Sequence, residues 1–213
     1  MRFSNRSEAG RQLAIALEHY RELNVVVLAL ARGGVPVGAE VANALDAPLE
    51  VLLVRKIGVP WQPEVAMGAV VDGARPIVVR DEAVAGLAGI SEAAFETLCQ
   101  RELVEIDRRR RRYFFGCVPL SIAGRIVIVV DDGIATGSSM RAAVHGIRQR
   151  QPLKIVVAVP VASPQAISNL QAEVDEVVCL YMPPAMGAVG YYYDEFAQVS
   201  DNDVVRLLGA FQK

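Results

Sequence analysis

Several features are absent from this sequence, and each absence excludes a class of protein. No apolar run reaches the length of a membrane span, and the polar segment at residues 1–14 lacks the apolar region of a signal peptide. The formal net charge is only −2, which gives no electrostatic case for binding nucleic acid or a membrane surface. The three cysteines, Cys99, Cys117 and Cys179, are far apart and lack metal-ligand spacing. We therefore expect buried thiols and a cytoplasmic protein.

Two common nucleotide-binding motifs are also missing. Neither the P-loop pattern Gly-x-x-x-x-Gly-Lys-Ser/Thr nor the pattern Gly-x-Gly-x-x-Gly occurs in the chain. What is present is a chain of 213 residues, 53% hydrophobic, in which apolar runs alternate with helical patterns. This length supports one well-buried core. The alternation predicts an α/β fold, an open and mostly parallel sheet flanked by helices.

The hydrophobic periodicity places the individual elements. We expect strands early in 24–38 and at 49–56, 76–82, 126–130, 154–162 and 177–183. We expect helices at 7–23, 37–45, 91–113, 140–150, 164–172 and 201–211. Residues 58–73 are rich in glycine and proline, and we expect this segment to contain a loop.

The most distinctive stretch is IVIVVDDGIATGSSM, residues 126–140. Five apolar residues predict a strand buried on both faces, and two carboxylates, Asp131 and Asp132, follow directly. A loop of small residues then opens into a helix, whose free N–H groups and dipole favour an anion. The carboxylates would repel that anion unless they face vicinal hydroxyls or a divalent cation. A sugar phosphate with a diol and magnesium satisfies all of these groups.

This stretch resembles the signature of the type I phosphoribosyltransferases, which binds 5-phosphoribosyl-1-pyrophosphate (PRPP). The resemblance implies Mg²⁺ as cofactor and a type I phosphoribosyltransferase-like fold with a small C-terminal hood. It implies a core at 1–182, with a helical insertion at about 80–118, and a hood segment with a last helix at 183–213. Asp131 and Asp132 would face the ribose hydroxyls. The PRPP-binding residues would be Asp131, Asp132, Gly133, Ala135, Thr136, Gly137, Ser138 and Ser139.

A glycine turn follows the first strand and reads Ala31-Arg32-Gly33-Gly34. Two glycines allow close backbone approach, and Arg32 offers a forked donor for phosphate. A plain strand-to-helix turn is the alternative. The family has a pyrophosphate-binding loop at this place, so the resemblance assigns Ala31, Arg32, Gly33 and Gly34 to pyrophosphate. It also makes the Ala31–Arg32 peptide bond a candidate for the cis form.

Two further segments carry the resemblance. Arg55 and Lys56 end a predicted strand where the family has a lid over the active site, and Lys56 would stabilise charge on the leaving pyrophosphate. A solvated strand end is the alternative. The tail VGYYYD resembles the family's hood. There Ala188 and Val189 would contact the base, Asp194 would join Asp131 at the metal, and Tyr193 replaces a leucine. Three core tyrosines are the alternative.

The implied reaction is phosphoribosyl transfer from PRPP to a nitrogen nucleophile of a small acceptor, with a nucleobase favoured. The alternative is a non-catalytic regulator that senses PRPP or nucleotides. Enzymes for hypoxanthine and guanine carry an aspartate where this chain has Ala135 and a lysine within the stretch matching 157–162, which has none. We therefore expect little activity on those two bases.

The run Arg108 to Arg112 ends the long predicted helix at 91–113. A solvated or ion-paired helix end, a subunit contact and a second phosphate site all fit it, because arginines near a helix C-terminus are also favoured by the dipole. A homodimer is the assembly that we consider.

Overall fold

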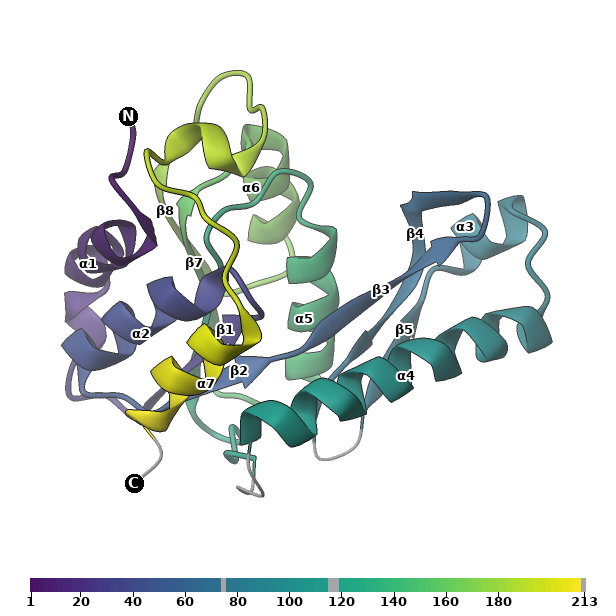
Figure 1. The fold of residues 1–213 in the computed structure, drawn as a ribbon, viewed down its shortest axis with the longest axis horizontal. Coiled ribbons are helices and arrows are strands. Elements are labelled where there is room, and N and C mark those ends of the chain that lie inside the picture. The colour runs from purple at the N-terminus through teal and green to yellow at the C-terminus, as the bar shows by residue number, and fades with distance from the viewer. Residues whose placement is uncertain (74–75, 115–118, 212–213) are drawn as a thin grey trace.

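The computed structural model describes residues 1–73, 76–114 and 119–211. Its centre is a five-stranded parallel sheet in the order β2-β1-β6-β7-β8. These strands are β1 (Val25–Leu30), β2 (Leu49–Leu52), β6 (Ile126–Val130), β7 (Lys154–Val161) and β8 (Glu176–Tyr181). The expected open and mostly parallel α/β sheet is confirmed (Figure 1).

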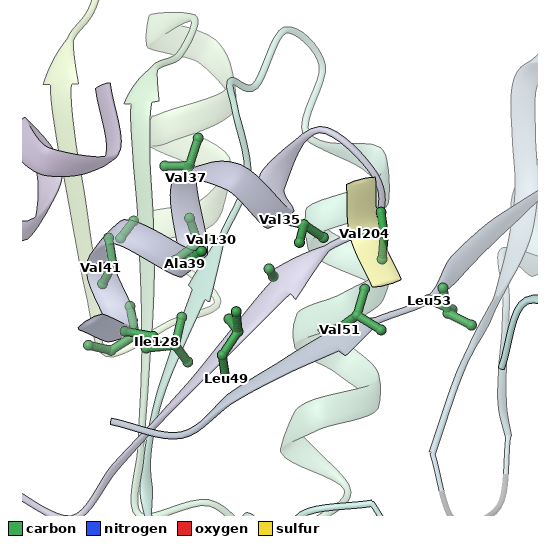
Figure 2. Packing of buried hydrophobic residues seen from close by; sticks show 14 of the residues in the cluster. Val35, Val37, Ala39, Val41, Leu49, Val51, Leu53, Ile128, Val130 and Val204 are labelled. Carbon is green, nitrogen blue, oxygen red and sulfur yellow. The ribbon is translucent and has the colours of Figure 1, made fainter. Parts of the chain in front are cut away.

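Helices cover both faces of this sheet. Helices α1 (Arg6–Ala16), α2 (Gly34–Leu45) and α7 (Asp201–Gly209) share a buried cluster with alternate residues of β1, namely Val25, Val27 and Ala29. The intervening residues of β1 belong to a second cluster with α5 (Ser138–Arg148) and α6 (Pro164–Gln171). Alternate strand residues point to opposite faces, so the run VVVLAL is buried on both. Figure 2 shows the first cluster, where α2 packs over β2 and β6.

Residues 54–114 form a second unit, which we call the arm. It contains the antiparallel sheet β3-β4-β5, with β3 (Val54–Val59), β4 (Gln62–Val71) and β5 (Ile77–Arg80), and the helices α3 (Glu82–Leu87) and α4 (Glu92–Phe114). The arm extends sideways from the main sheet, and α4 runs back along it toward α7 (Figure 1). Buried side chains of α4, such as Ile106 and Tyr113, belong to the same cluster as α2. The arm and the main sheet therefore share one core.

One expected element in this region is wrong, and another is shorter than its composition suggests. The segment 49–56 does not form one strand, because the chain leaves β2 after Leu52 and enters β3, in the other sheet, at Val54. The segment 58–73 contains the expected loop, but that loop is short and most of the segment is strand, because only Pro60 and Trp61 separate β3 from β4. Its glycines serve close packing between strands. A Cβ on Gly58 would lie 2.9 Å from the Cα of Pro63.

The other differences from the expected elements are small. The helix expected at 7–23 is α1 followed by a short 3-10 helix, η1 (Glu18–Tyr20). Helices α2 and α5 begin a few residues earlier than expected, at Gly34 and Ser138. The long helix expected at 91–113 is α4, which buries Phe95, Cys99, Ile106, Tyr113 and Phe114.

The chain after β8 folds over the main sheet as the hood, with the 3-10 helix η2 (Val189–Tyr192). Tyr193 is buried and pairs with Phe3 in an isolated parallel bridge, so the hood is fastened to the N-terminal segment. The hood boundary at residue 183 stays a prediction.

Among the described residues, no helix is both long and apolar enough to cross a membrane. Cys99 and Cys179 are free thiols, the first buried and the second half-buried. Cys117 lies outside the described residues.

Candidate active site

The two signature loops meet at one edge of the main sheet. Strands β1 and β6 are parallel neighbours, with Ala29 opposite Val130. The loop after β1, residues 31–34, therefore lies beside the loop after β6, residues 131–139. Ligands bind at this carboxyl edge in open α/β sheets. The structure thus brings together the residues assigned from sequence to pyrophosphate and to the ribose phosphate.

The two glycines of the first loop make room for the two aspartates of the second. A Cβ on Gly33 would overlap the carboxylate of Asp132. A Cβ on Gly34 would lie 2.6 Å from the carbonyl oxygen of Val130 and 2.9 Å from the Cα of Asp131. Glycine is therefore needed at both positions so that the two loops can lie close to each other. The peptide bond between Ala31 and Arg32 is cis, which confirms that prediction.

The carboxylate pair is held by few protein groups. An oxygen of Asp131 accepts the backbone N–H of Asp132 at 2.8 Å. Asp132 forms an ion pair with Arg6, whose Nε lies 2.7 Å from its Oδ2. Burial raises the pKa of Asp131 well above its ordinary value, and the charge of Asp132 raises it further. Burial also raises the pKa of Asp132, while Arg6 opposes that rise.

Arg6 is a site residue that the sequence reasoning missed. It begins α1, 126 residues away from Asp132 in the chain. Its guanidinium also donates to the carbonyl of Ala197 at 2.8 Å and lies 3.8 Å from the ring centroid of Phe196. No local pattern around residue 6 signals this role, because its partners come from the loop after β6 and the C-terminal tail.

The loop from Gly133 to Ser139 has the form of an anion cradle. Within the described chain, the backbone N–H groups of residues 135–139 donate to no other residue. The hydroxyls of Thr136 and Ser138 lie 3.2 Å apart, and Ser163 fixes the loop by donating to the carbonyl of Ala135 at 2.7 Å. Helix α5 begins at Ser138, so its N-terminal dipole adds to the free donors.

The hood closes over this cradle. Val189 packs so closely that a Cβ on Gly133 would lie 2.5 Å from its Cγ1. Tyr193 donates its hydroxyl to the carbonyl of Asp132 at 2.6 Å. Tyr193 is buried but Tyr191 is 70% exposed, so the alternative of three core tyrosines is wrong. Asp194 is exposed at the surface and lies 3.2 Å from the Nε of Arg2.

Arg55 and Lys56 lie on opposite faces of β3, as neighbours in a strand must. The Nε of Arg55 donates to Glu102 of α4 at 2.6 Å. Lys56 lines a pocket of about 430 Å³ beside α5, together with Ser138 and Arg141. The structure thus brings Lys56 toward the cradle and turns Arg55 toward α4.

The carboxylates fit a magnesium ion that is shared with a substrate. Asp131 has one backbone donor for its two oxygens, so the pair can accept a cation or hydroxyl groups. No group of three or more His, Cys, Asp and Glu side chains in the described regions could hold a metal alone. Mg²⁺ commonly takes one or two protein carboxylates and fills its other positions with water and substrate phosphates.

Comparisons with known proteins agree with this architecture. The family model described as the phosphoribosyl transferase domain matches residues 93–195. Two Mycobacterium tuberculosis proteins, "Putative phosphoribosyl transferase MT0597" of strain CDC 1551 / Oshkosh and "Putative phosphoribosyl transferase Rv0571c" of strain H37Rv, are 45% identical over 207 residues. The match covers 97% of this chain and 46% of each relative, so the chain spans about half their length.

A solved structure covers the whole length. The crystal structure of TT1426 from Thermus thermophilus is 42% identical, covers 99% of both chains and has a TM-score of 0.87. The fold and the paired loops define the class of protein. The chain belongs to the phosphoribosyltransferase family.

Proposed function

We propose that this protein transfers the phosphoribosyl group of PRPP to a nitrogen atom of a small acceptor and releases pyrophosphate. The observation that carries the proposal is the meeting of three features at one sheet edge. These are the carboxylate pair, the cradle of free N–H groups and the loop at residues 31–34. A phosphate, a diol and a diphosphate are the ligand groups that such a set can bind.

Each feature has a separate task in this reaction. The cradle at residues 133–139 holds the 5′-phosphate, and the carboxylates of Asp131 and Asp132 accept the ribose hydroxyls. The loop at residues 31–34 and Arg32 hold the pyrophosphate. Val189 and Ala188 of the hood lie above the cradle and contact the acceptor. Catalysis then consists of orienting the two reactants and stabilising the leaving group.

Magnesium is the cofactor in this proposal, with Asp131 and Asp194 as its protein ligands. When bound, it supplies positive charge beside the diphosphate oxygens. Asp194 is 58% exposed and forms an ion pair with Arg2, so a cation at Asp194 would compete with Arg2. Arg55 and Lys56 are the other groups assigned to the reaction. Lys56 and Ser138 line one pocket, which supports Lys56 as a group that contacts PRPP and stabilises charge on the leaving pyrophosphate.

In this proposal the acceptor is a compound other than hypoxanthine or guanine. Ala135 provides no carboxylate, and the end of β7 carries no lysine to bond an oxo group. Adenine, uracil and less common nitrogen acceptors remain as candidates. A site without polar partners for an oxo group gains no selectivity for it.

A panel of acceptors tests the function directly. The purified protein is given PRPP, Mg²⁺ and one base at a time, and pyrophosphate release is measured. We expect turnover with an acceptor other than hypoxanthine and guanine. Rates with either of these above all other bases would contradict the assignment of the acceptor. No PRPP binding at millimolar concentration would contradict the whole proposal.

The alternative function is a PRPP or nucleotide sensor, in which the arginine run 108–112 could contact a nucleic acid, and the charges give that contact little support. Each arginine of the run 108–112 has an acidic partner in the structure. The partners are Glu105, Asp72, Asp107 and Asp201. An ion-paired helix end, one of the interpretations considered above, describes this run.

A further inference from the structure

A pocket of about 480 Å³ lies beside the loop at residues 31–34, and three arginines from distant parts of the chain line it. Arg6 comes from the start of α1, Arg32 from the loop after β1, and Arg109 from the last turns of α4. Ala31 and Gly33 form another part of the wall. We call this space the arginine pocket.

The arginine pocket has more positive than negative charge on its walls. Asp132 is its one acidic lining residue within the described chain, and it is already paired with Arg6 at 2.7 Å. The acids that accompany Arg32 and Arg109 are Asp201 and Glu105, which do not line the pocket. Guanidinium groups gathered in this way repel one another unless an anion lies between them.

Arg109 has donors to offer to such an anion. Its Nε donates to Glu105 at 2.7 Å, which fixes the direction of the side chain. Its two terminal nitrogens donate to no other residue in the described part of the chain. Its side chain is 21% exposed, compared with 80% for Arg111 on the same helix. A planar guanidinium with free terminal N–H groups can bind two phosphate oxygens at once.

We propose that Arg109 is a pyrophosphate-binding residue, contributed to the active site by the arm. This inference rests on the proposed function, and it extends the pyrophosphate site beyond the loop at residues 31–34. Arg109 and Arg32 bind the diphosphate of PRPP from two sides, and Arg6 holds Asp132 in place beside them. Lys56 lines a different pocket, so the positive charge on the walls of the arginine pocket comes from arginines.

Three ligands separate the two ends of the substrate in a test. Inorganic pyrophosphate with Mg²⁺ reports the leaving-group end, ribose 5-phosphate reports the cradle, and PRPP with Mg²⁺ reports both. Binding is measured by calorimetry for the wild-type protein and for Arg109→Gln, Arg109→Lys and Arg111→Gln. The last is the matched control, because it removes the same charge from the same helix outside the arginine pocket. Thermal melting of each variant confirms folding.

Loss of one charged, two-pronged contact is expected to weaken binding by about tenfold or more. Arg109→Gln should therefore lose about tenfold in affinity for pyrophosphate and PRPP and keep its affinity for ribose 5-phosphate. Arg109→Lys should recover part of the loss, and Arg111→Gln should bind like wild type. In kinetics, Arg109→Gln should raise the KM for PRPP and leave the KM for the acceptor unchanged.

Two results would overturn the assignment while leaving the proposed function intact. One is pyrophosphate affinity in Arg109→Gln equal to that of Arg111→Gln. The other is a raised KM for the acceptor alone, which would place an anionic acceptor in the arginine pocket. Failure of the wild-type protein to bind PRPP and ribose 5-phosphate would instead overturn the proposed function, and this inference with it.

Discussion

The two ends of the candidate site offer different kinds of chemical group to a ligand. The cradle at residues 133–139 offers backbone N–H groups and hydroxyls from one continuous segment. The leaving-group end combines fully charged side chains, Arg6, Arg32, Arg109 and Asp132, from four separate segments. Neutral dipoles in one loop depend on the local backbone. Opposed charges depend on how α1, α4 and the main sheet pack against one another.

This difference has physical consequences. Buried carboxylates and guanidinium groups are costly unless each has a partner, so the leaving-group end is stabilised by ion pairs and by ligand. The pair between Arg6 and Asp132 is largely buried, with side-chain exposures of 11% and 13%. The cradle carries no net charge and has no such need. Substitutions that change charge should therefore affect the leaving-group end. Substitutions that change the cradle backbone should affect the cradle.

The largest effect is expected from Asp131→Asn combined with Asp132→Asn. At one hundred times its dissociation constant, PRPP with Mg²⁺ should stabilise the wild-type protein by about 2.7 kcal/mol. For a chain of this size, that corresponds to a rise in Tm of roughly 5–10 °C. The double variant should lose most of this rise, because the ribose hydroxyls and the cation lose their acceptors. An unchanged rise, measured by calorimetric melting, would contradict the assignment of both carboxylates.

The next largest effect is expected where the loop at residues 31–34 contacts the loop at residues 131–139. Gly34→Ala should destabilise the protein by about 1–3 kcal/mol, because the added methyl overlaps the backbone of Val130 and Asp131. Gly209→Ala is the matched control, since nothing lies within 4 Å of its Cβ position in α7. Alanine there should be neutral or slightly stabilising. Denaturant unfolding measures both, and equal effects would contradict the close approach of the loops.

A change of pH should act on the carboxylate pair of Asp131 and Asp132. The folded-state pKa of Asp131 is raised by burial and by the charge of Asp132, so the folded state binds its proton more tightly than the unfolded state. The stability this gives is complete below the ordinary pKa of 3.8 and is lost as pH rises through the higher folded value. The advantage of Asp131→Asn over the ligand-free wild type should therefore grow between about pH 4 and neutrality. A pH-independent difference in Tm would contradict it.

The comparison also explains which parts could be predicted from sequence. The buried strands of the main sheet and the loop at residues 131–139 are contiguous, so hydrophobic runs and a small-residue motif indicate them. The cis bond before Arg32 followed from the resemblance alone and is confirmed. In contrast, Arg6 and Arg109 reach the site only through tertiary packing. Their neighbours in the sequence resemble those of ordinary surface arginines.

The arm was predicted less well for a related reason. Residues 51–54 are all apolar, so their pattern gives no sign that Leu53 divides two sheets. The glycines and prolines of 58–73 are typical of loops. Here Gly58 instead permits close packing of β3 against β4. Local composition could not separate these cases, because the decisive contacts are between strands.

The smallest effect is expected where the hood joins the two ends. Tyr193→Phe removes the hydroxyl that donates to the carbonyl of Asp132 at 2.6 Å and keeps the ring packed on Phe3 and Phe196. Loss of one such bond should destabilise the protein by about 0.5–1.5 kcal/mol. Because the carbonyl belongs to the residue between the cradle and the arginine pocket, binding of ribose 5-phosphate and of pyrophosphate should weaken together. Tyr191→Phe is the control, since Tyr191 is exposed and should change neither. If Tyr193→Phe weakened only one ligand, the hood would serve one end of the site, and the two ends would be mechanically independent.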